Sequence, residues 1–244
     1  MPPTRVHTVR EYEGELQRIR EMLLMMGAKV EEMLTQAVKA LAQRDSALAD
    51  KTLYIDREIN KLEIEVDDLC LRVLARRQPV ASDLRFLTMA LKVVTDLERM
   101  GDLGVNICER VMELNEEEPL DSYLQIQNMA EAAQEMLREA LDAFVAADAD
   151  RAQAIVEQDS KVDAYYATIF RELLTYMMEN PRTIYRATRV QSIAKYIERI
   201  ADHATNVAEM VVFMVRGKDI RHVGKLERRA QSARPPNVAP ASRK

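Results

Sequence analysis

The sequence predicts an all-α protein built from two tandem, duplicated three-helix bundles with six long antiparallel helices. Three observations support this: glycine is scarce, apolar residues recur at helical spacing, and the pattern of the first half returns in the second. The chain has only six glycines in 244 residues, where average usage would give about 17. Sandwiches, barrels and doubly wound sheets need glycine at their tight turns, so these folds are excluded.

The helical segments are separated by prolines and by helix-capping sites. Pro79, Pro119 and Pro181 each lie where an apolar pattern pauses, and proline interrupts a helix interior. Asp45 and Asp148 follow strong helical patterns and are good N-cap residues for the next helix. The chain then divides into six segments: 5–44, 46–77, 80–115, 121–147, 149–179 and 182–216.

Each segment has the period of a helix with one buried face. In the first and fourth segments, apolar residues recur at steps of three and four: Met22, Met26, Val30, Met33, Leu34, Ala37, Val38 and Leu41, then Met129, Ala133, Met136, Leu137, Ala140, Leu141 and Phe144. Good helix formers fill the remaining positions. A segment of about 30 residues is about 45 Å long as a helix, and short connections make neighbours antiparallel.

The two halves of the chain repeat each other. The order of long segments and prolines in the first half returns about 100 residues later. The best match aligns residues 96–109 with 196–209. Five polar residues agree without a gap: Glu98, Arg99, Asp102, Asn106 and Glu109 with Glu198, Arg199, Asp202, Asn206 and Glu209. We therefore predict one bundle over 5–115 and a duplicate over 121–216.

Composition and charge narrow the functional class. The net charge is −5, which does not favour nucleic-acid binding. The two cysteines, Cys70 and Cys108, are interpreted as small core residues of a reducing compartment. No apolar signal or bilayer-spanning run is found, so a cytoplasmic location is expected. Residues 217–244 carry eight basic and two acidic side chains; this composition predicts a basic, disordered tail, with contact to an anionic surface as the alternative.

Acidic residues form a stripe on the third and sixth segments. Residues four apart on a helix are turned by only about 40°, so Glu98 and Asp102 lie on one face, as do Glu198 and Asp202. Like charges at this spacing repel each other unless a cation intervenes, and hard cations and iron prefer several carboxylate oxygens. Other acidic pairs at the same spacing occur in the chain, so only the recurrence of this one in both halves favours a metal site.

The second helix of each bundle supplies further candidate ligands. In the first half, Asp56 and Asn60, followed by Glu63 and Asp67, form a stripe. In the second half, Asp159 and Asp163 take the corresponding places, and the two later stripe positions become Tyr166 and Phe170, which are not acids. An equally good interpretation is that acids near a helix start interact with the helix dipole.

Other chemistries have little support in the sequence. Phosphate-binding glycine loops, dinucleotide fingerprints and nucleophile elbows are absent. Neither cysteine has a histidine nearby in sequence, and no Glu-x-x-His pair of a di-iron site occurs. His203 lies about 100° from Asp202 around the helix and is interpreted as a packed or exposed histidine. We expect no enzymatic activity.

Taken together, residues 5–222 resemble the PhoU family of regulators of bacterial phosphate uptake. The resemblance depends on segments spread along the chain: 23–27, 56–60, 96–102 with Asn106, 159–163, 198–203 with Asn206, and 217–222. It implies two three-helix bundles that hold metal clusters in repeated acidic motifs. Carried over by position, the implied ligands are Glu98, Asp102, Glu198, Asp202, Asp56, Asp159 and Asp163, and the implied metal is iron, zinc, manganese or magnesium. Asn60 departs from the family pattern, in which an acid would complete the motif.

The resemblance also implies a function and partners. PhoU-like proteins act as negative regulators of the high-affinity phosphate transporter and of the phosphate-starvation two-component response. The implied partners are the ATPase subunit of the transporter, the sensor histidine kinase and a second copy in a homodimer, with association at the membrane through these partners and no nucleic acid. Two alternatives stay open: a metal-independent helical adaptor, and a paralogue that regulates another transporter. An oxygen-ligated metalloenzyme such as a phosphatase ranks last.

Overall fold

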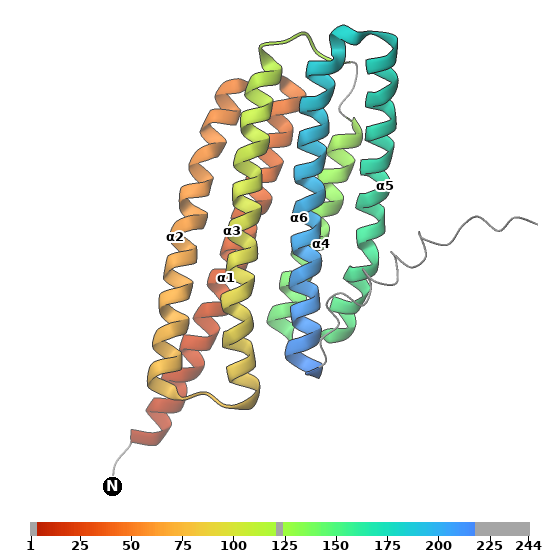
Figure 1. The fold of residues 1–244 in the computed structure, drawn as a ribbon. Coiled ribbons are helices and arrows are strands. Elements are labelled where there is room, and N and C mark those ends of the chain that lie inside the picture. Colours follow the sequence, from red (N-terminus) through yellow and green to blue (C-terminus); the bar gives the residue numbers. More distant parts are fainter. Residues whose placement is uncertain (1–3, 121–123, 218–244) are drawn as a thin grey trace, which may run out of the picture.

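Six long helices stand side by side along one axis (Figure 1). A computed structural model describes residues 4–120 and 124–217. The helices are α1 (Thr4–Gln43), α2 (Ser46–Arg77), α3 (Ala81–Asn115), α4 (Leu124–Ala146), α5 (Ala149–Glu179) and α6 (Ile184–Arg216), with the 3₁₀ turn η1 (Pro181–Thr183) before α6. The described residues contain no strand, so the predicted all-α class is confirmed.

The predicted breaks coincide with the observed helix ends. The side chain of Asp45 accepts from the backbone N–H of Leu48 at 2.9 Å, and that of Asp148 accepts from Asp150 and Arg151 at 3.1 and 3.0 Å. These bonds satisfy backbone donors that the first turn of a helix leaves unpaired. The last segment differs slightly from the prediction, because the Asn180 side chain caps a 3₁₀ turn before the α-helix begins.

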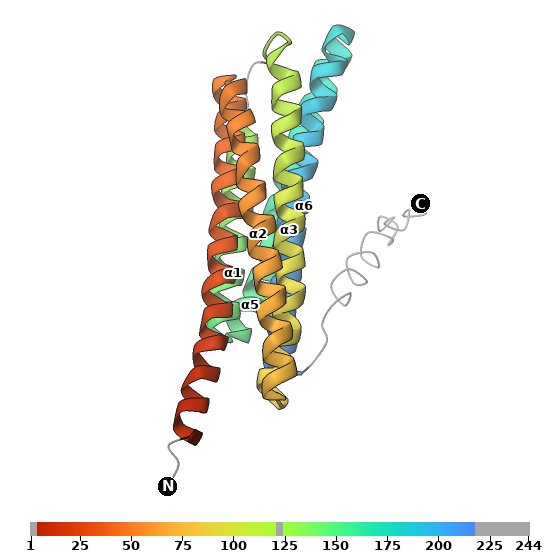
Figure 2. The same ribbon diagram turned by 90° about the vertical axis from the view of Figure 1, so that its left-hand side faces the viewer.

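Helices α1, α2 and α3 pack on one another as one bundle, and α4, α5 and α6 form the second. The bundles meet where α3 lies against α6 and α1 lies against α4, and the turned view shows the bundles overlapping along their length (Figure 2). Buried apolar side chains of all six helices join into one continuous core. The domain limits 5–115 and 121–216 remain predictions, and the predicted tail lies outside the described residues except for Gly217.

A glycine allows the two bundles to come close together. A Cβ placed on Gly27 of α1 would lie 2.0 Å from the Leu141 side chain of α4. Any larger side chain would therefore have to displace Leu141. The side chain of Leu141 therefore occupies the space beside Gly27, where α1 and α4 meet.

Candidate functional site

Helices α2 and α3 together carry a row of acidic and amide side chains, which we call the first acidic seam. Its members are Asp56, Asn60, Glu63 and Asp67 of α2 with Glu98 and Asp102 of α3. Gly101 brings the two helices close together, since a Cβ there would lie 3.4 Å from Asp56 Oδ1 and 3.2 Å from Ile59 Cδ1. This small residue thus permits α2 and α3 to approach closely beside Asp56 and Ile59.

Hydrogen bonding in the first acidic seam is incomplete. The Asn60 amide nitrogen donates to Asp56 Oδ2 at 2.9 Å. The other carboxylate oxygen of Asp56 and the amide oxygen of Asn60 are both buried from solvent, with no hydrogen-bond partner among the described residues. Buried acceptors without a donor are costly, so two oxygens in this seam lack the positive or donor group that would stabilise them.

Burial and neighbouring carboxylates raise the pKa of two acids in the first acidic seam, Asp56 and Glu98. Burial raises the pKa of Asp56, and the nearby charge of Asp102 raises it further, while the bond from Asn60 lowers it. Burial also raises the pKa of Glu98, with further upward contributions from Asp102, Glu63 and Asp56 and an opposing one from Arg99. These four carboxylates are therefore close enough to repel one another.

Two more members of the seam are destabilised as anions. Burial, Asp67 and Asp102 raise the pKa of Glu63, whereas Arg99 lowers it, and burial raises the pKa of Asp67. Neither residue is among the seven ligands implied by the resemblance. Their helical spacing from Asp56 nevertheless identifies both in the sequence analysis, because residues 56, 60, 63 and 67 form one stripe on a helix.

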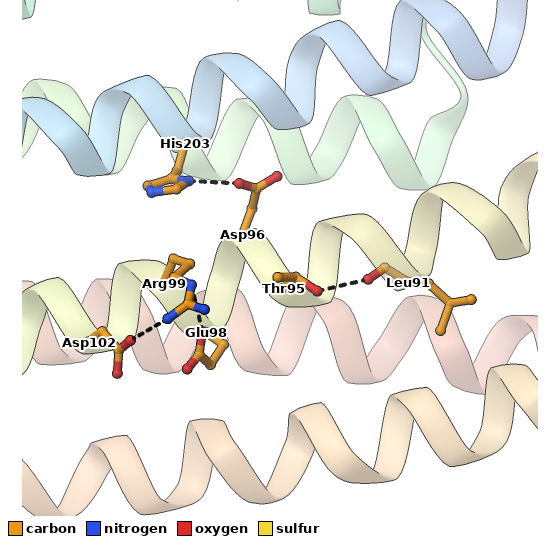
Figure 3. A network of polar contacts seen from close by, with 7 residues as sticks. All are labelled: Leu91, Thr95, Asp96, Glu98, Arg99, Asp102 and His203. Atoms are coloured by element: carbon orange, nitrogen blue, oxygen red, sulfur yellow. Dashed lines mark hydrogen bonds and ion pairs between the residues drawn. The ribbon is translucent and has the colours of Figure 1, made fainter.

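A cation of α3 faces the seam. The guanidinium of Arg99 lies 3.1 Å from Asp102 Oδ2 and 3.5 Å from Glu98 Oε2 (Figure 3). Its side chain is 59% exposed, so solvent screens these ion pairs. The seam therefore retains excess negative charge.

The described residues do not form a complete ligand set at the predicted metal site. Within them, no three or more His, Cys, Asp or Glu side chains are gathered so as to hold a metal ion. Asp56, Glu98 and Asp102 lie near one another in the first seam, whereas Asp159, Asp163, Glu198 and Asp202 lie on the other bundle. The seven residues thus divide into two groups.

The second acidic seam comprises Asp159 and Asp163 of α5 with Glu198 and Asp202 of α6. Asp159 is buried and Asp163 is exposed. The Lys195 ammonium forms an ion pair with Glu198 and lies 5.4 Å from the centre of the Tyr166 ring. This seam has its own lysine packed against it.

Aligned positions explain the difference between the seams. Lys195 corresponds to Thr95 of the first bundle, whose hydroxyl donates to the Leu91 carbonyl at 3.1 Å. In α5, Tyr166 and Phe170 take the places of two acids of α2. Asp163 in turn stands where α2 has Asn60, so the second seam has four carboxylates against five in the first, and it has a lysine where the first has Thr95.

A histidine–aspartate pair joins the two bundles. His203 Nδ1 of α6 lies 2.7 Å from Asp96 Oδ1 of α3, and the side chains are 18% and 14% exposed. Figure 3 shows Asp96 pointing toward α6, whereas Glu98, Arg99 and Asp102 face away from it. His203, which the sequence analysis interprets as packed or exposed, is mostly buried here. Its pairing with Asp96 has no sequence signal, since it depends on how the two bundles pack together.

These features define the class of protein: a duplicated helical bundle whose equivalent helices carry related but unequal acidic seams. The described part of the chain has no helix with the length and apolar content to cross a membrane. The PhoU domain family matches residues 23–111 and 126–211, one match in each bundle. The chain belongs to the PhoU family, and the predicted resemblance is confirmed.

Similar proteins and structures agree with this assignment. The chain is 44% identical over 219 residues to a phosphate-specific transport system accessory protein PhoU homolog of Pseudomonas aeruginosa, covering 89% of this chain and 90% of the relative. It superposes on the crystal structure of PhoU from Pseudomonas aeruginosa with a TM-score of 0.80 at 44% identity, covering 85% of this chain and 100% of that one.

A second crystal structure is that of the phosphate transport system regulatory protein PhoU from Streptococcus pneumoniae. It matches with a TM-score of 0.79 at 30% identity and covers 86% of this chain and 99% of that chain. These relatives are accessory and regulatory proteins of phosphate transport.

Proposed function

We propose that this protein is a negative regulator of high-affinity phosphate uptake and of the phosphate-starvation two-component response. The observation that carries the proposal is the family match in both bundles, together with 44% identity to a phosphate transport accessory protein over nearly its whole length. The proposed partners are the ATPase subunit of the phosphate transporter and the phosphate-sensing histidine kinase. The protein acts in the cytoplasm, reaches the membrane through these partners and carries out no catalytic step.

The long helices support regulation by contact. Large apolar side chains remain exposed on the outer faces, among them Tyr54, Ile64 and Leu71 of α2, which are 58%, 68% and 58% exposed. Exposed apolar groups on a helical face are suited to binding another protein.

The experiment is to delete the gene and restore it, with alkaline phosphatase activity in phosphate-rich medium as the readout. Activity should be high in the deletion strain and low again after the gene is restored. Equal activity in both strains would overturn the proposal and favour regulation of a different transporter.

We propose further that a divalent or ferric cation binds the first acidic seam. The buried oxygens of Asp56 and Asn60 lack partners among the described residues, and the pKa values of Asp56, Glu63 and Glu98 are raised by burial and by neighbouring carboxylates. Oxygen ligands of this kind suit magnesium, manganese or iron. The bound cation would supply positive charge that holds α2 and α3 together.

The second seam provides the matched control for this test. Metal content and the melting temperature would be measured with and without added Mn²⁺, Mg²⁺, Zn²⁺ or Fe²⁺, for Glu98→Gln/Asp102→Asn and for Glu198→Gln/Asp202→Asn. The first pair should abolish most of the cation-induced rise in melting temperature, and the second should leave most of it. An equal rise in the wild type and the first variant would refute the site.

A metal-independent helical adaptor is the second candidate. Basic side chains of the chain itself already pair with acids of both seams, and this favours a protein that needs no metal. Arg99 contacts Glu98 and Asp102, and Lys195 pairs with Glu198. Repression that survives both double substitutions, in protein without bound metal, would select this candidate.

A further inference from the structure

A small cavity lies at one end of the molecule, between the two bundles. Its volume is about 220 Å³, and its walls come from α1 and α3 of the first bundle and from α4 and α6 of the second. Figure 1 shows that α3 begins and α6 ends at this end of the molecule. Pockets for drug-sized ligands usually measure about 300–1,000 Å³, so this cavity suits an ion or a very small molecule.

Two arginines hold their head groups at the wall of this cavity, which we call the arginine cavity. The Arg20 guanidinium lies 4.5 Å from the centre of the Phe86 ring, and that ring packs against Phe144 with centroids 5.4 Å apart. Arg85 Nε donates to the Met214 carbonyl at 2.9 Å, which uses one of the five N–H donors of a guanidinium. All these residues line the cavity, so both positive groups are positioned there before a ligand binds.

Neither of these arginines has an ion-pair partner in the described part of the chain. Seven arginines in that part are half-buried. Four of them form ion pairs: Arg77, Arg110, Arg186 and Arg189. A fifth, Arg44, donates to two backbone carbonyls. The remaining two are Arg20 and Arg85, and both line the arginine cavity. Partly buried charges without a countercharge are costly, so the two guanidinium groups favour an anion there.

The one acid that lines the cavity, Asp83, decides which anion fits. Asp83 Oδ2 accepts from the Tyr12 hydroxyl at 2.8 Å, and the Ser82 hydroxyl lies 3.4 Å from Oδ1. A carboxylate offers about four acceptor sites, so Asp83 can accept one more hydrogen bond. A fully ionised anion would only repel this carboxylate, whereas an anion that keeps an O–H can donate to it. Inorganic phosphate keeps an O–H at neutral pH and sulfate keeps none, so the acid favours phosphate.

We propose that the arginine cavity binds inorganic phosphate as hydrogen phosphate. The guanidinium groups of Arg20 and Arg85 donate to its ionised oxygens, and its own O–H donates to Asp83. Guanidinium suits this role because its planar fork of donors matches phosphate geometry. The Ser82 hydroxyl, whose contact with Asp83 is long, supplies a further donor. Since the walls come from both bundles, a bound phosphate joins the bundles at this end and stabilises the folded chain.

The aligned end of the second bundle lacks this arrangement. Tyr185 stands where the first bundle has Arg85. The half-buried arginines at that end, Arg186 and Arg189, already pair with glutamates. Arg182 lies at the same end and is exposed, so its replacement removes one positive charge without touching the arginine cavity. This residue provides the matched control.

Equilibrium dialysis with radiolabelled phosphate tests the site in the full chain after metals have been removed. The wild type should bind one phosphate per chain. Arg20→Gln and Arg85→Gln should each bind at least about tenfold more weakly, since a hydrogen bond to a charged group contributes about this factor. Arg182→Gln should bind like the wild type. Absence of saturable binding to the wild type, or equal weakening in all three variants, would refute the site.

Competition by sulfate tests the role of Asp83. Excess sulfate should leave phosphate bound to the wild type, because sulfate has no O–H to donate to this carboxylate. In Asp83→Asn the amide can donate instead, so sulfate should displace phosphate. Equal displacement from the wild type and from Asp83→Asn would contradict the proposed hydrogen bond and with it the choice of phosphate.

Ser82→Asp separates loss of the site from loss of the fold. Position 82 is exposed and lies in the first turn of α3, where an acidic side chain interacts favourably with the helix dipole. The new carboxylate should pair with the two guanidinium groups and exclude phosphate, while the melting temperature without phosphate is not lowered. Phosphate binding as strong as that of the wild type would count against the site.

The first acidic seam needs its own control, because phosphate also binds metal cations. Glu98 lies 13 residues after Arg85, which is about 20 Å along α3. Glu98→Gln/Asp102→Asn should therefore bind phosphate as the wild type does. Loss of binding in this variant, with binding unchanged in both arginine variants, would assign phosphate to the seam and overturn the proposal.

The phosphate site does not depend on the proposed regulation of phosphate uptake, and the two can fail separately. If the deletion strain shows no change in alkaline phosphatase while dialysis detects phosphate that Arg85→Gln loses and Arg182→Gln keeps, the site stands and the proposed function fails. If the restored gene represses alkaline phosphatase while the wild type binds no phosphate, the proposed function stands and the site is wrong.

Discussion

The two bundles have matching cores and unequal acidic seams. In the cores, Leu97 of α3 and Ile197 of α6 occupy aligned positions and are both 0% exposed. In the seams, the first bundle has buried oxygens without partners, whereas the second has Lys195 paired with Glu198. After a duplication, both cores must stay filled with apolar side chains. The negative charge of an acidic seam, in contrast, can be balanced either by a bound cation or by a basic side chain. In the second bundle a lysine supplies this charge, and in the first the proposed cation would supply it.

The largest expected effect tests the similarity of the cores. Leu97→Ala and Ile197→Ala each remove a fully buried branched side chain, which costs about 2–5 kcal/mol of unfolding free energy. Urea unfolding should give losses of similar size for the two variants. A large loss in one bundle with almost none in the other would contradict the idea of equivalent cores.

The next effect tests the contact between the bundles. Asp96→Ala leaves the half-buried ring of His203 without its 2.7 Å partner, and losing one member of such a pair costs about 1–3 kcal/mol. The double variant Asp96→Ala/His203→Ala should lose less than the sum of the single variants. Additive losses by urea unfolding would show that the two side chains do not interact.

The first acidic seam makes stability depend on pH. Because the pKa values of Asp56, Glu63 and Glu98 are raised, the folded chain binds more protons than the unfolded chain between the ordinary and the raised values. The contribution of the first seam to stability therefore falls as pH rises through this window. Metal-free protein should gain stability from this seam on mild acidification.

Asp102→Asn should reduce that pH dependence, because the charge of Asp102 raises the pKa of both Asp56 and Glu98. It should also raise the melting temperature of the metal-free protein at neutral pH. The matched variant Asp202→Asn should do neither. Melting curves recorded from acidic to neutral pH test both statements, and a steeper profile in Asp102→Asn would contradict the proposed repulsion.

The smallest expected change in stability comes from exchanging one residue between the two seams. Thr95→Lys introduces into the first seam the cation that the second already has at the aligned position, and Lys195→Thr removes it from the second. Partly exposed ion pairs contribute about 0.2–1 kcal/mol. Thr95→Lys should stabilise metal-free protein and reduce its response to added cations, and Lys195→Thr should destabilise it slightly. Opposite shifts in melting temperature would disprove this account.

Local sequence patterns predicted the helices well. The N-caps at Asp45 and Asp148 and the proline breaks coincide with the observed ends, because these signals act over a few residues of the same chain. The start of α6 was less well predicted, since Asn180 and Pro181 form a 3₁₀ turn whose length the apolar spacing does not specify.

The acidic seams were predicted in part. Glu98 and Asp102 share a face with their neighbours on one helix, which spacing reveals directly. Glu63 interacts with Asp102 across two helices, and Asp96 meets His203 across two bundles. Such contacts depend on the rotation and offset of packed helices, which no local pattern encodes. The roles of the seven proposed ligands remain predictions.

Helix α3 bears Asp96 on one side and the first acidic seam on the other (Figure 3). Because a helix is stiff, a cation bound at the proposed site that drew α3 toward α2 would also change the distance from Asp96 to His203. Thermodynamic reciprocity then requires that loosening the contact between the bundles alter the affinity for that cation by the same factor. A partner that pulls the bundles apart would in this way govern ion occupancy from a distance, without touching a single ligand.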